Sequence, residues 1–116
     1  MNDKTSKGKE RRVHYRLGHP NADIPKLMVW RDEYQVIDVS EDGVKFRCDE
    51  YSGVKPGQTV SATITFHDGE SFDLEGKIMR IQDNEIAIKL SKGIPYKKIV
   101  KEQRYLIRKY SLPLQA

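Results

Sequence analysis

The sequence predicts a mainly β domain in which about six antiparallel strands form a small barrel and an α-helix follows at the C-terminal end. Three observations support this fold class. Short runs alternate between apolar and polar residues, turn-forming dipeptides separate the runs, and the last segment changes to a helical period. Strands joined by short turns are typical of an antiparallel meander, and closing the meander into a barrel removes its exposed edges.

The alternation is clearest in residues 44–48, 60–66 and 86–90, where every second residue is apolar. This pattern is typical of strands that bury one face. The dipeptides that predict turns are Asp42-Gly43, Pro56-Gly57, Asp68-Gly69 and Asp83-Asn84. Between residues 72 and 82 the apolar phase shifts, so Gly76 is predicted to mark a β-bulge. A first strand is expected around residues 26–30.

The last segment predicts an amphipathic helix with Pro95 in its first turn. The residues expected on its buried face are Ile99, Val100, Gln103, Leu106, Ile107 and Tyr110. The remaining positions are mostly basic, and basic residues near the end suit the negative pole of the helix dipole. We expect this face to pack on the barrel, and a second hypothesis is that the helix also docks a partner.

The chain of 116 residues is predicted to form one domain over residues 11–116, preceded by a flexible, lysine-rich leader over residues 1–10. No run is long and apolar enough to span a membrane, and the N-terminus is charged where a signal peptide is apolar. We therefore expect a cytoplasmic protein without direct membrane insertion. Cys48 is the only cysteine, which excludes an intrachain disulfide.

The net charge of +4 is distributed unevenly. Residues 1–18 carry six basic and two acidic residues, and residues 92–116 carry seven basic residues and one acidic residue, so the middle of the chain is acidic. A barrel that binds nucleic acid needs basic strands along the phosphates. The charge pattern instead favours a small anionic ligand or an acidic partner that the two ends of the domain contact.

No catalytic arrangement is visible, and we expect neither an enzyme nor a bound cofactor or metal. The three histidines, His14, His19 and His67, show no metal-ligand spacing, and no glycine-rich phosphate loop occurs. The serines and the cysteine lack a pattern that marks an activated nucleophile.

Two short motifs stand out. The first is an RxxxR sequence from Arg12 to Arg16, and the second is a DxSxxG sequence from Asp38 to Gly43. An RxxxR sequence also occurs from Arg104 to Arg108, where helical spacing alone places two bases on one solvated face. The DxSxxG sequence alone is compatible with an ordinary hairpin turn. The two motifs are therefore informative only through their order and their position relative to the predicted strands.

With the first motif just before the first strand and the second at a strand end, the chain resembles the PilZ domain family over nearly its whole length. The resemblance implies a six-stranded antiparallel barrel with a C-terminal helix. It also implies that the protein is a bacterial receptor for the second messenger cyclic di-GMP. The implied partner is an unidentified protein of the motility, pilus or exopolysaccharide machinery.

The residue types suit this ligand, which carries two phosphates and two guanines. The expected binding residues are Arg11, Arg12, Arg16, Asp38, Ser40 and Gly43. An arginine can bond a guanine edge or clamp a phosphate with two hydrogen bonds. A carboxylate at Asp38 can accept from guanine N–H groups, Ser40 can donate to an acceptor, and Gly43 is expected to permit a positive φ angle and close approach of the backbone.

The polar leader has few apolar anchors, so we expect the arginine motif to become ordered when the ligand binds and to create a surface for the partner. In the family, a basic residue at the position of Arg11 implies two stacked ligand molecules per chain. Two alternatives remain: a PilZ-like interaction module that needs no nucleotide, and a small-barrel binder of nucleic acid, which the acidic middle disfavours.

Overall fold

The structure, a computed structural model, describes residues 12–15, 19–50 and 53–110. The leader expected over residues 1–10 lies outside the described residues. In chain order the elements are the strand β1 (Val13–His14), the short 3₁₀-helix η1 (Asn21–Asp23), the strands β2 (Lys26–Val29), β3 (Asp32–Val39), β4 (Gly43–Arg47), β5 (Thr59–Thr65), β6 (Ser71–Gln82) and β7 (Glu85–Lys92), and the helix α2 (Tyr96–Tyr110).

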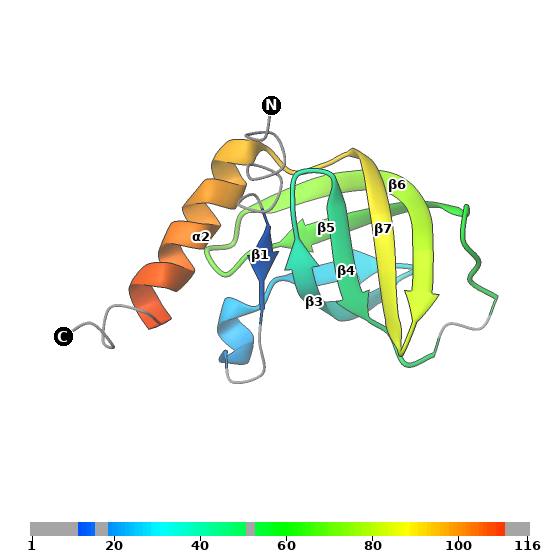
Figure 1. Ribbon diagram of the computed structural model, residues 1–116, viewed down its shortest axis with the longest axis horizontal. Helices are drawn as coiled ribbons and strands as arrows, with labels where there is room; N and C mark the ends of the chain where they lie inside the picture. The colour runs from blue at the N-terminus through cyan, green and yellow to red at the C-terminus, as the bar shows by residue number, and fades with distance from the viewer. Residues whose placement is uncertain (1–11, 16–18, 51–52, 111–116) are drawn as a thin grey trace, which may run out of the picture.

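The strands β2 to β7 close into a six-stranded antiparallel barrel, which confirms the predicted fold class. Their spatial order is β3, β2, β5, β6, β7 and β4, and β4 pairs back onto β3. The short β1 adds to the end of β3, where Val39 has Val13 as its partner on one side and Val44 on the other. Figure 1 shows β1 between the barrel and α2, so the start of the domain lies beside its last helix.

The barrel core follows from the alternation seen in the sequence. Val39, Val44, Ile88 and Ile78 are cross-strand partners in register on four neighbouring strands, and each is at most 2% exposed. Because directly paired residues in a sheet point to the same face, this row faces the interior. The residues between them along each strand therefore face outward, where the candidate site lies.

Turns and bulges set the register. Asp83 and Asn84 both have positive φ angles, 54° and 62°, as a two-residue hairpin turn requires. The register of β6 with β7 shifts between Glu75 and Gly76, which confirms the predicted bulge. A Cβ atom at Gly76 would lie 2.2 Å from the carbonyl oxygen of Lys89, so only glycine fits there. The strand expected around residues 26–30 is β2, the second strand of the structure. It ends one residue early because Trp30 and Arg31 form a second tight turn.

The helix α2 begins directly after Pro95, and Ile99 and Leu106 are buried as predicted. Three other residues of the predicted face are half-buried, namely Val100, Gln103 and Tyr110. The prediction is wrong for Ile107, which is 60% exposed, and it missed Lys98 and Glu102, which are buried. The helix is thus rotated from the orientation that its apolar residues alone predict. The reason is that the barrel surface offers polar partners to these two side chains, as described below.

Candidate functional site

The candidate site begins with a row of outward-facing residues across five strands. His14 on β1 pairs with Asp38 on β3, and Asp38 pairs with Lys45 on β4. Lys45 in turn pairs with Ala87 on β7, and Ala87 with Arg80 on β6. Strand register therefore places one carboxylate among basic side chains, with a small residue between Lys45 and Arg80.

Over this row lies a pocket with a volume of about 90 Å³. Four of the six residues expected to bind ligand line it together, namely Arg12, Asp38, Ser40 and Gly43. A second, polar pocket of about 270 Å³ adjoins it, and Lys45, Arg80 and Ala87 line both. Arg11 and Arg16, the other two expected residues, lie outside the described residues. The two motifs thus meet at one place on the barrel, although they are far apart in the sequence.

Asp38 is 7% exposed and lies between two potential cations. Its Oδ2 atom is 3.8 Å from Nδ1 of His14 and 3.8 Å from Nζ of Lys45. Both distances exceed that of a hydrogen bond, so these contacts balance charge without occupying the carboxylate lone pairs. Nζ of Lys45 is also 3.7 Å from Oε1 of Glu85. The Asp38 carboxylate can therefore accept hydrogen bonds from a ligand that enters the pocket.

The loop of the DxSxxG motif is held by its own hydrogen bonds. The backbone N–H of Ser40 donates to the carbonyl of Gly43 at 2.8 Å, and the Ser40 hydroxyl donates to Oδ1 of Asp42 at 3.1 Å. The hydroxyl proton expected to serve a ligand is thus used within the loop, and the oxygen keeps acceptor capacity. The expectation of a positive φ angle at Gly43 is wrong, because Gly43 starts β4 in extended backbone.

The end of β7 and the segment that follows it support this loop. The N–H of Leu90 donates to the carbonyl of Asp42 at 2.8 Å, and that of Ile94 donates to the carbonyl of Glu41 at 3.2 Å. A Cβ atom at Gly93 would lie only 1.8 Å from the Glu41 carbonyl oxygen, so the close approach requires glycine. Sequence reasoning missed this role of Gly93, because nothing local links it to the loop.

Sequence reasoning also missed Lys45 and Arg80 as site residues. Both lie on strands with an outward-facing phase, but each strand has several outward polar residues. Only the register across β3, β4, β7 and β6 brings these two to the pocket that Asp38 lines. The polar alternation of residues 44–48 is the one sequence signal that could have suggested Lys45.

The described residues of the arginine motif, 12–15, are held on the barrel. Val13 is 2% exposed, and the N–H of Tyr15 donates to the carbonyl of Ile37 at 2.8 Å. From the other side, Nε2 of Gln103 donates to the carbonyl of Arg12 at 3.2 Å. The strand β1 is therefore fixed by both β3 and α2, while the Arg12 side chain remains exposed at the pocket.

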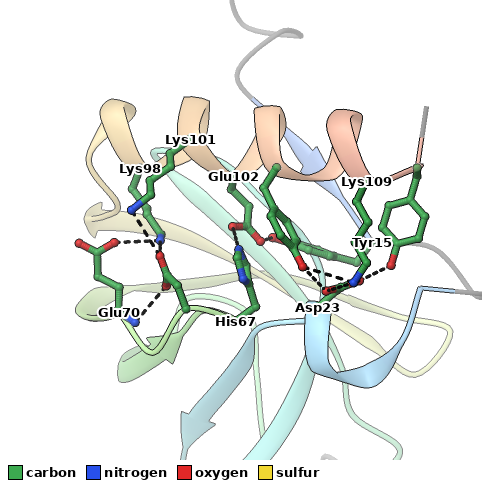
Figure 2. Close-up of polar contacts among 11 residues, drawn as sticks. Tyr15, Asp23, His67, Glu70, Lys98, Lys101, Glu102 and Lys109 are labelled. Atoms are coloured by element: carbon green, nitrogen blue, oxygen red, sulfur yellow. Dashed lines mark hydrogen bonds and ion pairs between the residues drawn. The ribbon is translucent and has the colours of Figure 1, made fainter. Parts of the chain in front are cut away.

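Glu102 is the most buried polar residue of α2, with an exposed fraction of 1% (Figure 2). Its Oε2 atom accepts a hydrogen bond of 2.7 Å from the Tyr15 hydroxyl. Its Oε1 atom lies 3.0 Å from Nε2 of His67, and this atom is hydrogen bonded only when that nitrogen carries the proton, since no other donor in the described residues reaches it. Burial raises the pKa of Glu102, against the opposing effect of these two partners.

A second cluster links α2 to η1. Asp23, 2% exposed, accepts hydrogen bonds from the hydroxyls of Tyr105, at 2.7 Å, and Tyr110, and from Nζ of Lys109 at 3.1 Å. Burial tends to raise the pKa of Asp23, but the hydrogen bonds from Tyr110, Tyr105 and Lys109 together lower it to about 2. The carboxylate therefore stays ionised and fixes the C-terminal half of α2.

A third cluster links the start of α2 to the loop between β5 and β6 (Figure 2). Nζ of Lys98 lies 2.8 Å from Oδ2 of Asp68 and 2.8 Å from Oε1 of Glu70. Burial would lower the pKa of Lys98, but hydrogen bonds to these two carboxylates raise it overall. The buried face of α2 is thus anchored at three points along its length.

The described residues contain neither a candidate metal site nor a candidate membrane span. Within residues 12–15, 19–50 and 53–110, no group of three or more His, Cys, Asp or Glu side chains is arranged to hold a metal ion. No helix in the same part of the chain is long and apolar enough to cross a membrane.

Fold and site together are those of a small, closed β-barrel that presents a charged pocket beside its N-terminal strand. The chain belongs to the PilZ domain family, whose sequence model matches residues 9–111. PilZ domains are binding modules. No functionally curated protein is significantly similar to the chain in sequence.

A solved structure shares the fold. The crystal structure of the Legionella uncharacterized protein Lpg0364 superposes with a TM-score of 0.56, covering 84% of this chain and 95% of that one. The two sequences are 13% identical, so the similarity concerns the fold alone.

Proposed function

We propose that this protein is a receptor for cyclic di-GMP. The observation that carries the proposal is the single pocket lined by Arg12, Asp38, Ser40 and Gly43, because residues of both signature motifs meet there. Membership of the PilZ domain family supports the same ligand.

The chemistry of the pocket suits a guanine nucleotide. Asp38 can accept from the N1–H and N2–H groups of a guanine, which the free lone pairs of its carboxylate allow. Arg12 can bond the O6/N7 edge of a guanine or a phosphate. Lys45 and Arg80 add positive charge beside the same pocket, where they can balance the phosphates. In this proposal Arg11 and Arg16 complete the set of bases around the ligand.

Signalling follows from the place of the arginine motif. Residues 12–15 lie between β3 and α2, and the ligand would add bonds to Arg12 and to the neighbouring arginines. Such bonds favour one arrangement of the whole N-terminal segment, and the combined surface of segment, ligand and barrel then becomes available to a partner. We propose that this partner is a protein of bacterial motility, pilus or exopolysaccharide machinery, as the family implies.

Calorimetric titration of the full chain with cyclic di-GMP tests the proposal, with GTP as the control ligand. We expect binding of cyclic di-GMP alone, and we expect Asp38→Asn to weaken it by roughly 1–3 kcal/mol, the range of one paired base contact. The matched control is Asp49→Asn, which makes the same change at an exposed position away from the pocket. A wild-type protein that binds neither nucleotide would favour the interaction module that needs no nucleotide.

A further inference from the structure

The outward face of α2 carries two parallel stripes of side chains. The basic stripe consists of Lys97, Lys101, Arg104 and Arg108, and the apolar stripe consists of Tyr96, Val100 and Ile107. Within each stripe the residues are three, four or seven positions apart, so that they line up along the helix axis. The basic stripe lies on the side of α2 opposite the buried residues Ile99 and Leu106, and the apolar stripe lies on the flank between the basic stripe and Ile99.

The apolar stripe is unusual for a surface helix because α2 packs on the barrel through other residues, Ile99 and Leu106. Tyr96 is 47% exposed and Ile107 is 60% exposed, while Val100 is half-buried between them. The helix thus has one apolar face against the barrel and a second that faces solvent. Exposed apolar side chains gathered on one element, next to charged ones, are typical of a protein interaction site.

The basic stripe, together with Tyr96, Val100 and Tyr105, forms one wall of a groove. The groove has a volume of about 700 Å³ and lies between α2 and the loop that carries His67 and Asp68. Its surface is mainly apolar, and all four residues of the basic stripe line it. The groove shares no lining residue with the pocket at Arg12 and Asp38, so a ligand in one does not exclude a ligand in the other.

The charge of the basic stripe is largely unbalanced. Among the described residues, only Lys101 of the four has a carboxylate within 4.0 Å, which is Asp68 at 3.5 Å. Asp68 is already paired with Lys98 at 2.8 Å. The one acidic residue of α2, Glu102, is buried on the opposite face. An occupant of the groove must therefore supply negative charge along the helix.

We infer that this groove docks an acidic amphipathic segment of another protein, most simply a helix. Its apolar side chains contact Tyr96 and Val100, which line the groove, and its carboxylates pair with the basic stripe. Duplex DNA would match the charge but not the apolar lining, because its backbone offers only phosphates. An anionic membrane would match both, but a planar surface does not fill a concave groove. The inference does not depend on nucleotide binding.

Fluorescence anisotropy with a labelled synthetic peptide tests the inference on the full chain. The probe is a helical peptide of about 18 residues, long enough to form a helix on binding, with leucines along one face and glutamates elsewhere. We expect it to bind the wild type at least tenfold more tightly than it binds Arg104→Glu/Arg108→Glu. The control variant Lys55→Glu/Lys77→Glu changes the net charge equally at exposed positions outside the groove, and it should bind like the wild type.

Three further probes decide between occupants: the same peptide with lysines in place of glutamates, a random DNA duplex, and anionic phospholipid vesicles. Binding of DNA or vesicles that exceeds binding of the acidic peptide would overturn the inference, as would equal binding of the lysine peptide. Sedimentation velocity tests whether a second copy of this chain occupies the groove. Self-association of the wild type that Arg104→Glu/Arg108→Glu abolishes would overturn it as well. Circular dichroism shows that each variant is folded.

Discussion

The Asp38 carboxylate lies 3.8 Å from the ammonium group of Lys45, its direct cross-strand partner, on the outer face of the barrel. Lys45 is in turn 3.7 Å from Glu85, so its charge is shared between two carboxylates. Neither distance is that of a hydrogen bond, so the ammonium group can turn toward an anion without first breaking a strong contact. In the proposed receptor, Lys45 therefore balances the charge of the two carboxylates without ligand and pairs with a phosphate when the ligand binds.

We expect Lys45→Gln and Arg80→Gln each to weaken cyclic di-GMP binding by about 1–3 kcal/mol, because each removes a charged partner of a phosphate. The loss should shrink at high salt, which screens charges at a surface site. Calorimetry at two salt concentrations measures both effects. Lys77→Gln, on β6 but outside both pockets, is the control and should bind like the wild type. Equal affinity of all three variants would exclude this side of the pocket as part of the site.

Two glycines near the DxSxxG loop should respond oppositely to alanine. A Cβ atom at Gly43 would make ordinary contacts, 3.6 Å from Oγ of Ser40 and from the carbonyl oxygen of Ile88, and the φ angle there is not positive. Gly43→Ala should therefore fold normally. Its methyl group takes up part of the pocket of about 90 Å³ that Gly43 lines, so ligand affinity should fall by roughly 1–3 kcal/mol.

Gly93→Ala should instead destabilise the fold by about 1–3 kcal/mol or more, because its Cβ atom would overlap the Glu41 carbonyl and displace the loop. Urea denaturation gives the stability of both variants, and calorimetry gives their affinities. If Gly43→Ala unfolds as readily as Gly93→Ala, the loop is less tolerant than its geometry indicates.

The cluster around Asp23 predicts a pH dependence with a definite sign. The folded-state pKa of this carboxyl is lowered to about 2, against about 3.9 in the unfolded chain. Its contribution to stability is therefore complete above the unfolded value and is lost as the pH falls through the folded value. Tyr105, Lys109 and Tyr110 all face this carboxyl from α2.

We expect Asp23→Asn to lower the free energy of unfolding at neutral pH by about 1.5–3 kcal/mol, the range for hydrogen bonds to a charged group. The difference from the wild type should be constant above about pH 5 and should decrease between about pH 4 and pH 2. Urea denaturation at a series of pH values, followed by circular dichroism, measures it. Asp49→Asn is the control at an exposed position. A difference that stays constant down to about pH 2 would contradict the lowered pKa of Asp23.

The strands could be predicted from the sequence because their signal is local. Residues 44–48 and 86–90 alternate, and the structure buries the apolar phase of each. The turn at Trp30 and Arg31 could not be predicted, since neither residue favours the positive φ angles of 53° and 69° that it adopts there. In the structure the Trp30 ring contacts those of Tyr34 and Phe46, which lie in β3 and β4.

The orientation of α2 could not be predicted from the sequence either, because it depends on contacts with residues far away in the chain. Lys98 and Glu102 are polar, and only distant partners make their burial favourable: Asp68 for the first, and Tyr15 for the second. Only part of the candidate site could be predicted from the sequence, for the same reason. The motifs identify Arg12 and Asp38, whereas Lys45 and Arg80 reach the same pocket only through strand register.

The last prediction concerns ligand stoichiometry and rests on Arg11, which precedes the RxxxR motif and lies outside the described residues. Two stacked molecules of cyclic di-GMP bring four phosphates together, and their repulsion requires an additional cation. A third guanidinium meets this need and can also stack on a guanine face, which a leucine side chain cannot do. We therefore expect two ligand molecules per chain for the wild type and a fall toward one for Arg11→Leu.

Calorimetric titration to saturation gives the stoichiometry of both proteins, and added salt should favour the lower value because it screens the arginine. Lys9→Leu is the control, since it removes a basic residue two positions earlier in the same segment and should leave the stoichiometry at two. A wild-type value of one at saturating ligand would show that Arg11 does not set the number of ligands. The pocket at Asp38 would remain the proposed site in that case, because Arg12, Asp38, Ser40 and Gly43 line it whatever the number of ligands.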